Sequence, residues 1–172
     1  MANKQALRDL QARLAERLLA AQTQARSQSW LAVECGGRGF LFPLLEAGEI
    51  FAVAPIKPVP HSRSWFLGVS NLRGHLNGVV DLAGYFGLKR AESGRDQARL
   101  VGFNRSLDIN CVMLVDKLSG LRGDEDMTRE ADDGIPRPAF AGGRLRDRAG
   151  QVWQELSLTE LAGDETFLKI VD

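Results

Sequence analysis

The chain is poor in the residues that most often carry enzymatic or metal chemistry. Its 172 residues include only two histidines and two cysteines, and aromatic residues make up 7%. Lysine plus arginine equals aspartate plus glutamate at 22 each, so the formal net charge is zero. A nucleic-acid-binding domain usually has a basic excess or a basic stripe with interleaved aromatics, and neither is present. The remote histidines and cysteines also lack the spacing of a zinc site.

Long hydrophobic segments are absent as well. No apolar run approaches the length needed to cross a bilayer, and the N-terminus lacks the charged-then-apolar layout of a signal peptide. We therefore expect a cytoplasmic protein without direct membrane insertion. Cys35 and Cys111 lie in apolar strand-like segments and are expected to be buried free thiols, with a disulfide between them as the alternative.

Motifs for catalysis are missing. The chain has no G-x-S-x-G sequence, Walker loop or dinucleotide fingerprint, and neither His61 nor His75 has a nucleophile or an orienting carboxylate beside it. Asp81 closes an apolar strand without a second acid or a base nearby, so we expect it to accept backbone N–H bonds or to cap the turn that follows. The sequence therefore predicts no catalytic residue, no metal site and no cofactor.

The region from about Lys117 to Arg137 is charged, with its acids concentrated in residues 122–134. It lacks the alternating ligands, central glycine and closing glutamate of a calcium-binding loop. Arg122 and Arg129 lie among the acids and partly neutralise them. We expect a solvated, mobile loop, with a partner-facing insertion as the alternative.

Residues 1–27 form a predicted N-terminal amphipathic helix, in which an apolar residue recurs every three or four positions. The residues of this stripe are Leu7, Leu10, Leu14, Leu18, Ala21 and Ala25. The stripe is narrow, as in a helix that packs against one surface. We expect it to cover an open end of the following domain, with a separate docking role as the alternative.

From residue 28 to residue 172 the apolar period becomes that of β-strands. Two apolar runs flank the turn Gly36-Gly37-Arg38, which predicts a hairpin. Further strands are predicted at 49–53, 66–70, 78–82, 100–104, 109–116, 139–145 and 151–156, and a short capped helix at 157–161. Three prolines between residues 55 and 60 favour an edge or an extended crossover. About nine or ten short strands predict a mainly β fold of two small antiparallel barrels or a sandwich.

The segment from Phe66 to Gly87 carries the strongest functional signal. Two apolar strands flank a polar turn, residues 70–74, in which Asn71 and Gly74 tolerate a positive φ. Arg73 then projects from a stiff β corner without an acid nearby in the sequence, which suits partner recognition better than chemistry. The alternative is a structural role in which Arg73 pairs with an acid elsewhere in the fold. The apolar residues of this region are expected in the core. They are Leu72, Leu76, Val79, Val80 and Leu82.

The block GVSNLRGHLNGVVDL, residues 68–82, resembles the signature of CheW-like coupling proteins of bacterial chemosensory systems. The resemblance is closest to the PilI-like branch, which serves type IV pili and twitching motility. The matching positions are Gly68, Asn71, Leu72, Arg73, Gly74, Leu76, Val79, Val80, Asp81 and Leu82. The resemblance implies a pair of five-stranded, barrel-like (SH3-like) β subdomains that share a core, with an N-terminal helix and short C-terminal helical segments.

The same resemblance implies a non-enzymatic adaptor that couples a methyl-accepting chemoreceptor to a CheA-type histidine kinase and is recruited to membrane-associated receptor arrays. The implied partners are the cytoplasmic tip of the receptor and the regulatory domain of the kinase. By position the receptor-binding residues are Val53, Gly68, Asn71 and Arg73, whereas the kinase-binding residues are unknown. Pro55 stands where many relatives have a glutamate, so we expect the arginine–glutamate arrangement of relatives to be missing. Gly78 replaces a proline and leaves that strand less rigid.

Two other classes of function are alternatives. A small β-barrel enzyme or ligand-binding domain would use a cleft between the subdomains, and tight binding of a small molecule or metal by the purified protein would favour it. A nucleic-acid-binding barrel would show salt-sensitive binding to oligonucleotides, but the neutral charge and scarce aromatics oppose it.

Overall fold

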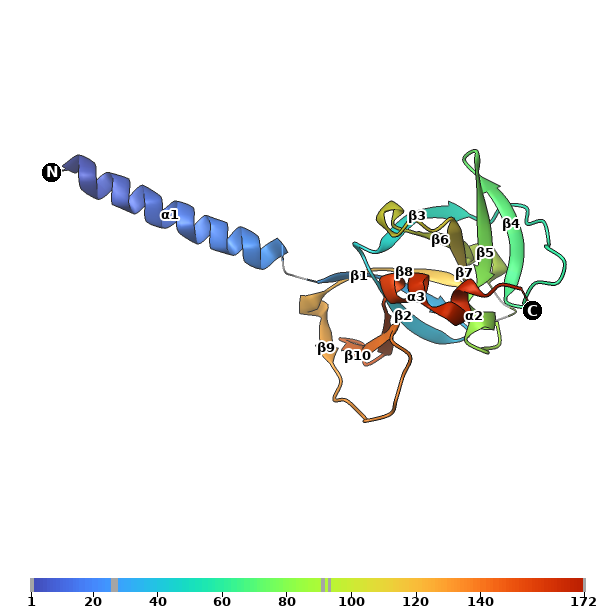
Figure 1. Cartoon of the computed structure of the whole chain (residues 1–172). Coiled ribbons are helices and arrows are strands. Elements are labelled where there is room, and N and C mark those ends of the chain that lie inside the picture. The colour runs from blue at the N-terminus through green and yellow to red at the C-terminus, as the bar shows by residue number, and fades with distance from the viewer. Residues whose placement is uncertain (1, 26–27, 91, 93, 172) are drawn as a thin grey trace.

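The computed structural model describes residues 2–25, 28–90, 92 and 94–171. Helix α1 (Ala2–Ala25) precedes a β domain of two sheets, with short helices between the strands and after the last strand (Figure 1). The strands are β1 Ser29–Cys35, β2 Arg38–Pro43, β3 Ala47–Ala52, β4 Phe66–Leu72, β5 His75–Asp81, β6 Arg99–Phe103, β7 Cys111–Val115, β8 Lys117–Gly123, β9 Met127–Arg129, β10 Ala141–Asp147 and β11 Val152–Leu156. The short helices are α2 Leu82–Tyr85, η1 Arg95–Gln97, η2 Arg105–Leu107, η3 Asp124–Asp126, α3 Leu158–Gly163 and α4 Glu165–Leu168.

The predicted mainly β fold with two subdomains is confirmed. One sheet has five strands in the order β3-β6-β7-β5-β4, and the other has six in the order β8-β1-β2-β11-β10-β9. Neighbouring strands are antiparallel except for the pairs β2–β11 and β5–β7. The predicted hairpin is β1–β2, which turns at Gly36 and Gly37, both with positive φ. The proline-containing segment runs beside the outer strand β4, where Lys57 and Val69 exchange two backbone hydrogen bonds of 2.8 and 2.9 Å.

The central strands of each sheet are apolar on both faces, which explains the continuous apolar runs in the sequence. In β1, Leu31 and Val33 lie in the core between the two sheets, whereas Trp30 and Ala32 lie in a second cluster on the other face. The same alternation divides β7 between the central core and a third cluster. Fully burying one such side chain contributes about 1.5–3 kcal/mol. The two sheets are therefore held together as one packed unit.

The C-terminal helices complete the central core. Ser157 accepts a hydrogen bond of 3.2 Å from the backbone N–H of Glu160, as the predicted helix cap requires. Leu158, Leu161 and Phe167 are buried in the central core. Ile170 is partly buried against the same core, whereas Leu168 and Val171 are exposed.

The prediction of a mobile loop over residues 117–137 is wrong for its first part. Strand β8 pairs with β1, and β9 pairs with β10, so both are edge strands of the six-stranded sheet. Most residues of β8 are only partly buried or exposed, and the pairing shifts register between Ala32 and Val33. Charged, irregular edge strands protect a sheet from unwanted pairing and lack a clear apolar alternation. That is why the sequence pattern did not predict them.

Arginines of β10 and its neighbourhood hold the acids that follow β9. Asp133 accepts hydrogen bonds from Arg137 (2.6 Å) and Arg144 (2.8 Å), and Glu130 accepts one of 2.6 Å from Arg146. The bond from Arg137 lowers the pKa of Asp133, and the bond from Arg146 lowers the pKa of Glu130. The acidic stretch is therefore paired with arginines of its own chain.

The expectation that α1 covers the β domain is wrong. Leu7, Leu10, Leu14 and Leu18 are each 51–64% exposed, and Figure 1 shows α1 extending away from the sheets. The cluster that contains Trp30 is fully buried without the helix. Alanine, leucine, arginine and glutamine dominate α1, and their high helix propensity favours a helix without tertiary packing. The side chains of Ala21 and Ala25, and the predicted helix end at residues 26–27, lie outside the described residues.

Two leucines on different helices test this difference in packing. Leu14→Ala removes a side chain that is 51% exposed on α1, whereas Leu161→Ala empties a fully buried site on α3. We expect Leu161→Ala to lower the free energy of unfolding by about 2–5 kcal/mol and Leu14→Ala by less than about 0.5 kcal/mol. Urea denaturation of the full chain measures both. Similar losses in the two variants would show that α1 packs against the β domain.

Candidate functional site

The predicted corner is a two-residue turn between β4 and β5. Leu72 and His75 form the last pair of the ladder, and Arg73 and Gly74 have φ values of 50° and 82°. Positive φ at both central residues is what a type I′ hairpin turn requires. Of the two residues expected to tolerate positive φ, Gly74 adopts it, whereas Asn71 is still paired within β4 and does not. Its side-chain oxygen instead accepts a hydrogen bond of 2.9 Å from the N–H of Gly74, which fixes the turn.

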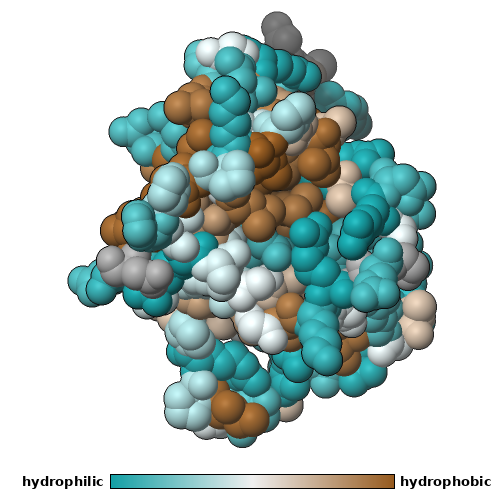
Figure 2. All heavy atoms as spheres, turned by 90° about the vertical axis from the view of Figure 1, so that its right-hand side faces the viewer, coloured by the Kyte–Doolittle hydropathy of each residue, from teal (hydrophilic) through white to brown (hydrophobic). Residues whose placement is uncertain are grey.

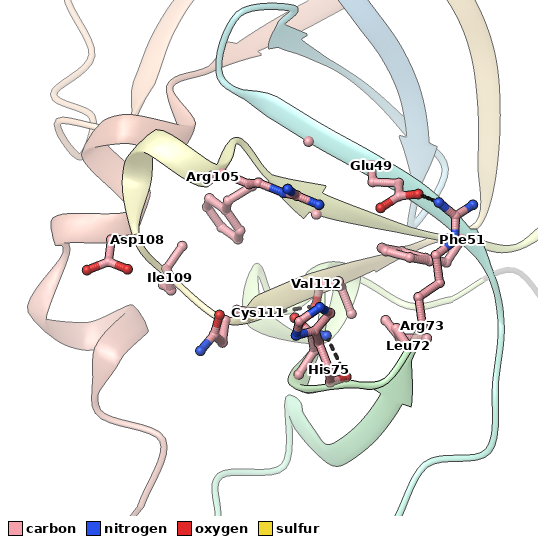
Figure 3. Close-up of a pocket in the computed structure, with 15 residues that line it drawn as sticks. Glu49, Phe51, Leu72, Arg73, His75, Arg105, Asp108, Ile109, Cys111 and Val112 are labelled. Carbon is pink, nitrogen blue, oxygen red and sulfur yellow. Dashed lines mark hydrogen bonds and ion pairs between the residues drawn. The ribbon is translucent and has the colours of Figure 1, made fainter.

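Arg73 leaves this turn towards β3. Its guanidinium forms an ion pair with Glu49 and lies 5.6 Å from the centre of the Phe51 ring (Figure 3). Pro55 provides no carboxylate where many relatives have a glutamate, and Glu49 of β3 pairs with Arg73 instead, which is the alternative expected for this arginine. The Arg73 side chain is nevertheless 71% exposed. Glu49 and Phe51 thus position the guanidinium of Arg73, and the rest of its surface remains accessible to a partner.

A groove of about 610 Å³ lies beside Arg73. Strands β3, β5 and β7 and the loop before β7 contribute to it, and Figure 3 shows its side chains. Its charged lining residues are Glu49, Arg73, Arg105 and Asp108. Acids and bases are equally represented, so the groove does not select for one sign of charge. Among the described residues no group of three or more His, Cys, Asp or Glu side chains is placed to hold a metal ion.

The structure places Val53 in a different groove. This second groove, of about 410 Å³, has an apolar wall that includes Ile56 and Leu67 and a charged rim that includes Arg90 and Asp116. Val53 is 47% exposed there. Figure 2 views the molecule from the right-hand side of Figure 1, and in its upper half apolar surface is bordered by hydrophilic side chains. Val53 and Arg73 are therefore both accessible but line separate depressions.

Gly68 has a structural reason to be glycine. Its φ is 134°, and a Cβ atom at this position would lie 2.0 Å from the carbonyl oxygen of Lys57. The proline-containing segment approaches β4 at this point. Of the four residues predicted to bind a receptor, the structure therefore brings Asn71 and Arg73 together at the turn. Val53 lies apart from them, and Gly68 lies beneath Lys57.

Asp81 does not cap α2, which corrects the prediction. The residue is at the N-cap position, but its side chain makes no capping hydrogen bond. One carboxylate oxygen is 3.8 Å from Nε of Arg90, and it has no hydrogen-bond partner within the described part of the chain. The same Arg90 nitrogen lies 3.5 Å from Asp116. Arg90 thus lies between two acids, and α2 forms without a side-chain cap.

Both cysteines are buried and free, as one of the two predictions stated. Burial raises the pKa of Cys111 to about 12. Burial raises the pKa of Cys35 further, and the nearby Asp116 adds to this effect. A thiol with a raised pKa carries almost no thiolate near neutrality and is a poor nucleophile. These residues are therefore core packing groups.

Leu76 is the exception among the apolar residues predicted for the core. Leu72, Val79, Val80 and Leu82 are buried, but Leu76 is 64% exposed. It lies opposite Asn71 in the β4–β5 ladder, one pair before the turn. Glu49, Phe51 and Arg105 were not predicted as site residues. They reach the groove through the β3–β6 pairing and the loop that follows, which no local pattern reveals.

Comparison with known proteins gives consistent matches. Residues 29–166 match the model of the CheW-like domain family. Protein PilI of Pseudomonas aeruginosa is 32% identical over 110 residues, which are 64% of this chain and 61% of that protein. Chemotaxis protein CheW of Rhizobium meliloti is 36% identical over 62 residues, which are 36% of this chain and 40% of that protein. The chain thus spans less than two thirds of either relative.

A solved structure shows the same fold. The scaffolding protein TtCheW of Thermoanaerobacter tengcongensis superposes with a TM-score of 0.61 at 17% sequence identity, covering 77% of this chain and 90% of that one. Within the described residues, no helix combines the length and the apolar character that crossing a bilayer requires.

Two glycines in the same hairpin test whether Lys57 approaches β4 as closely as the structure shows. We expect Gly68→Ala to lower the free energy of unfolding by at least about 2 kcal/mol, because its Cβ meets a backbone carbonyl. Gly74→Ala meets no atom within 4 Å of its Cβ, and its φ of 82° is closer to the left-handed region that other residues tolerate, so it should cost only about 1 kcal/mol. Urea denaturation compares the two. Equal losses would contradict the close approach of Lys57.

Proposed function

The chain belongs to the CheW-like domain family, and we propose that it is a non-enzymatic adaptor coupling a methyl-accepting chemoreceptor to a CheA-type histidine kinase. The match to the family over residues 29–166 supports this proposal. The similarity to PilI favours a pathway that controls type IV pili and twitching motility. Recruitment to membrane-associated receptor arrays follows from the same assignment.

The observation that carries the proposal is the display of Arg73. An arginine that is 71% exposed on a tight turn, held by Glu49 and Phe51, loses little conformational freedom when it binds a partner. Arginines with this kind of support are common anchors of protein interfaces. We assign Arg73 to the receptor contact, with Asn71 fixing the turn and Val53 making a second contact.

Gly68 has an indirect role in this scheme. It permits the close approach of Lys57 to β4, which closes the outer side of the five-stranded sheet. A substitution there would disturb the turn through the backbone of β4. We therefore do not count Gly68 among the residues that touch the receptor.

Coupling requires no chemistry in the adaptor. If the receptor and the kinase bind separate faces of a rigid domain, the state of one partner changes the affinity or orientation of the other, and this linkage is reciprocal. The three packed apolar clusters make the β domain stiff enough for this role. The alternative of a ligand site between the subdomains has no support, because apolar side chains fill the space between the sheets.

Charge reversal at Arg73 tests the receptor contact. We expect Arg73→Glu to weaken binding of a receptor-tip fragment by about thirtyfold or more, as loss of an anchoring arginine does, and to leave binding of the kinase regulatory domain unchanged. Calorimetric titration measures both. Stability should change by less than about 1 kcal/mol, because an exposed ion pair contributes little.

The double variant Glu49→Arg/Arg73→Glu is the matched control. It restores the ion pair with its charges exchanged, so the contact between β3 and the turn returns while the displayed charge stays reversed. We expect receptor binding to remain lost. Recovered receptor binding would show that Arg73 acts only by holding the turn to β3.

A further inference from the structure

Helix α1 presents a row of exposed leucines. Leu7, Leu10, Leu14 and Leu18, hereafter the leucine seam, are spaced by three, four and four residues and share one face of the helix. Each is more than half exposed. The seam is one residue wide and contains no aromatic side chain, so its shape is that of a helix-to-helix contact.

The charges of α1 are not evenly distributed around this seam. Arg13 and Arg17 each follow a seam leucine by three positions, so they lie beside the seam. Asp9 and Glu16 each lie two positions from a seam leucine, which places them on the far side of the helix. All four side chains are exposed, and within the described residues neither arginine forms an ion pair. The leucine seam therefore has a basic flank.

We propose that α1 docks an α-helix of another protein whose own apolar seam is flanked by aspartate or glutamate. Interdigitated leucines would provide the affinity of such a helix pair, and charges beside the seam would select the partner and its orientation. The seam leucines occupy i, i+3, i+7 and i+11 positions, which is the anchor spacing of helical recognition. The partner carboxylates would pair with Arg13 and Arg17.

Two other occupants fit the helix less well. A second copy of α1 would bring leucines but no carboxylate to the basic flank, because the acids of α1 lie on its far side. A membrane surface is bound by helices with a wide apolar face that usually includes Trp or Phe, and α1 has neither. Charge complementarity therefore selects an acidic helix of another protein.

This surface is separate from the turn that displays Arg73. Binding at the leucine seam can therefore be measured without the receptor or the kinase. If the seam does not bind a helix, the proposed role of Arg73 is unaffected, and the reverse also holds.

Binding of two designed peptides to the full chain tests the inference. Both are helical and carry leucines at the spacing of the seam, and one has glutamate beside its seam where the other has lysine. Fluorescence anisotropy of the labelled peptides measures affinity. We expect the glutamate peptide to bind about tenfold tighter than the lysine peptide, and this preference to shrink as salt is added.

Two variants of the chain then assign the contact. Leu10→Gln/Leu14→Gln should weaken binding of the glutamate peptide by about a hundredfold, since two buried leucines are lost while helix propensity is kept. Leu45→Gln is the matched control, because Leu45 is 89% exposed and lies outside α1. Arg13→Glu/Arg17→Glu should invert the preference to the lysine peptide, whereas Arg38→Glu, at an exposed position of β2 outside α1, should not.

Three results would overturn the proposal. The first is equal binding of the two peptides or no binding of either. The second is sedimentation that shows the chain dimerising in a way that Leu10→Gln/Leu14→Gln abolishes, which would assign the seam to a second copy. The third is seam-dependent binding to phosphatidylserine vesicles that the glutamate peptide does not compete away, which would assign it to a membrane.

Discussion

Burial of both faces of the central strands is the constraint on which the rest of the structure depends. Strands such as β1 and β7 contribute to two apolar clusters at once, so neither sheet can shift without exposing a core. Dense packing of this kind transmits strain and resists deformation. The hairpin β4–β5 extends from this unit, and its turn holds Arg73 in a defined place (Figure 1). No leucine of α1 is needed to bury the core, and the leucines of that helix stay exposed.

A packed β domain with an exposed helix beside it suits an adaptor. The β domain offers a rigid surface on which charged and apolar side chains are already positioned, so binding costs little ordering. Arg73 is held by residues of β3 while most of its surface stays in solvent. Helix α1 extends away from this domain and keeps its leucines exposed (Figure 1). An adaptor of this kind would affect signalling by binding the receptor and the kinase at the same time.

Local patterns in the sequence predicted most strands, the β1–β2 hairpin and the corner that carries Arg73, because these depend on alternation and turn chemistry. They failed where the outcome depends on distant parts of the chain. The pairing of Arg73 with Glu49 follows from how β3 lies against the turn, and β8 is a strand only because β1 lies beside it. The exposure of Leu14 and Leu76 could not be predicted either, since periodicity shows which residues share a face but not whether anything covers it.

Simultaneous binding of both partners tests the central claim most directly. The full chain would be mixed with the kinase regulatory domain and the receptor-tip fragment, and the masses of the complexes measured by sedimentation velocity. The account predicts a ternary complex containing all three components, because the two partners use different faces of one rigid domain. Displacement of one partner by the other, with only binary complexes present at saturation, would contradict it.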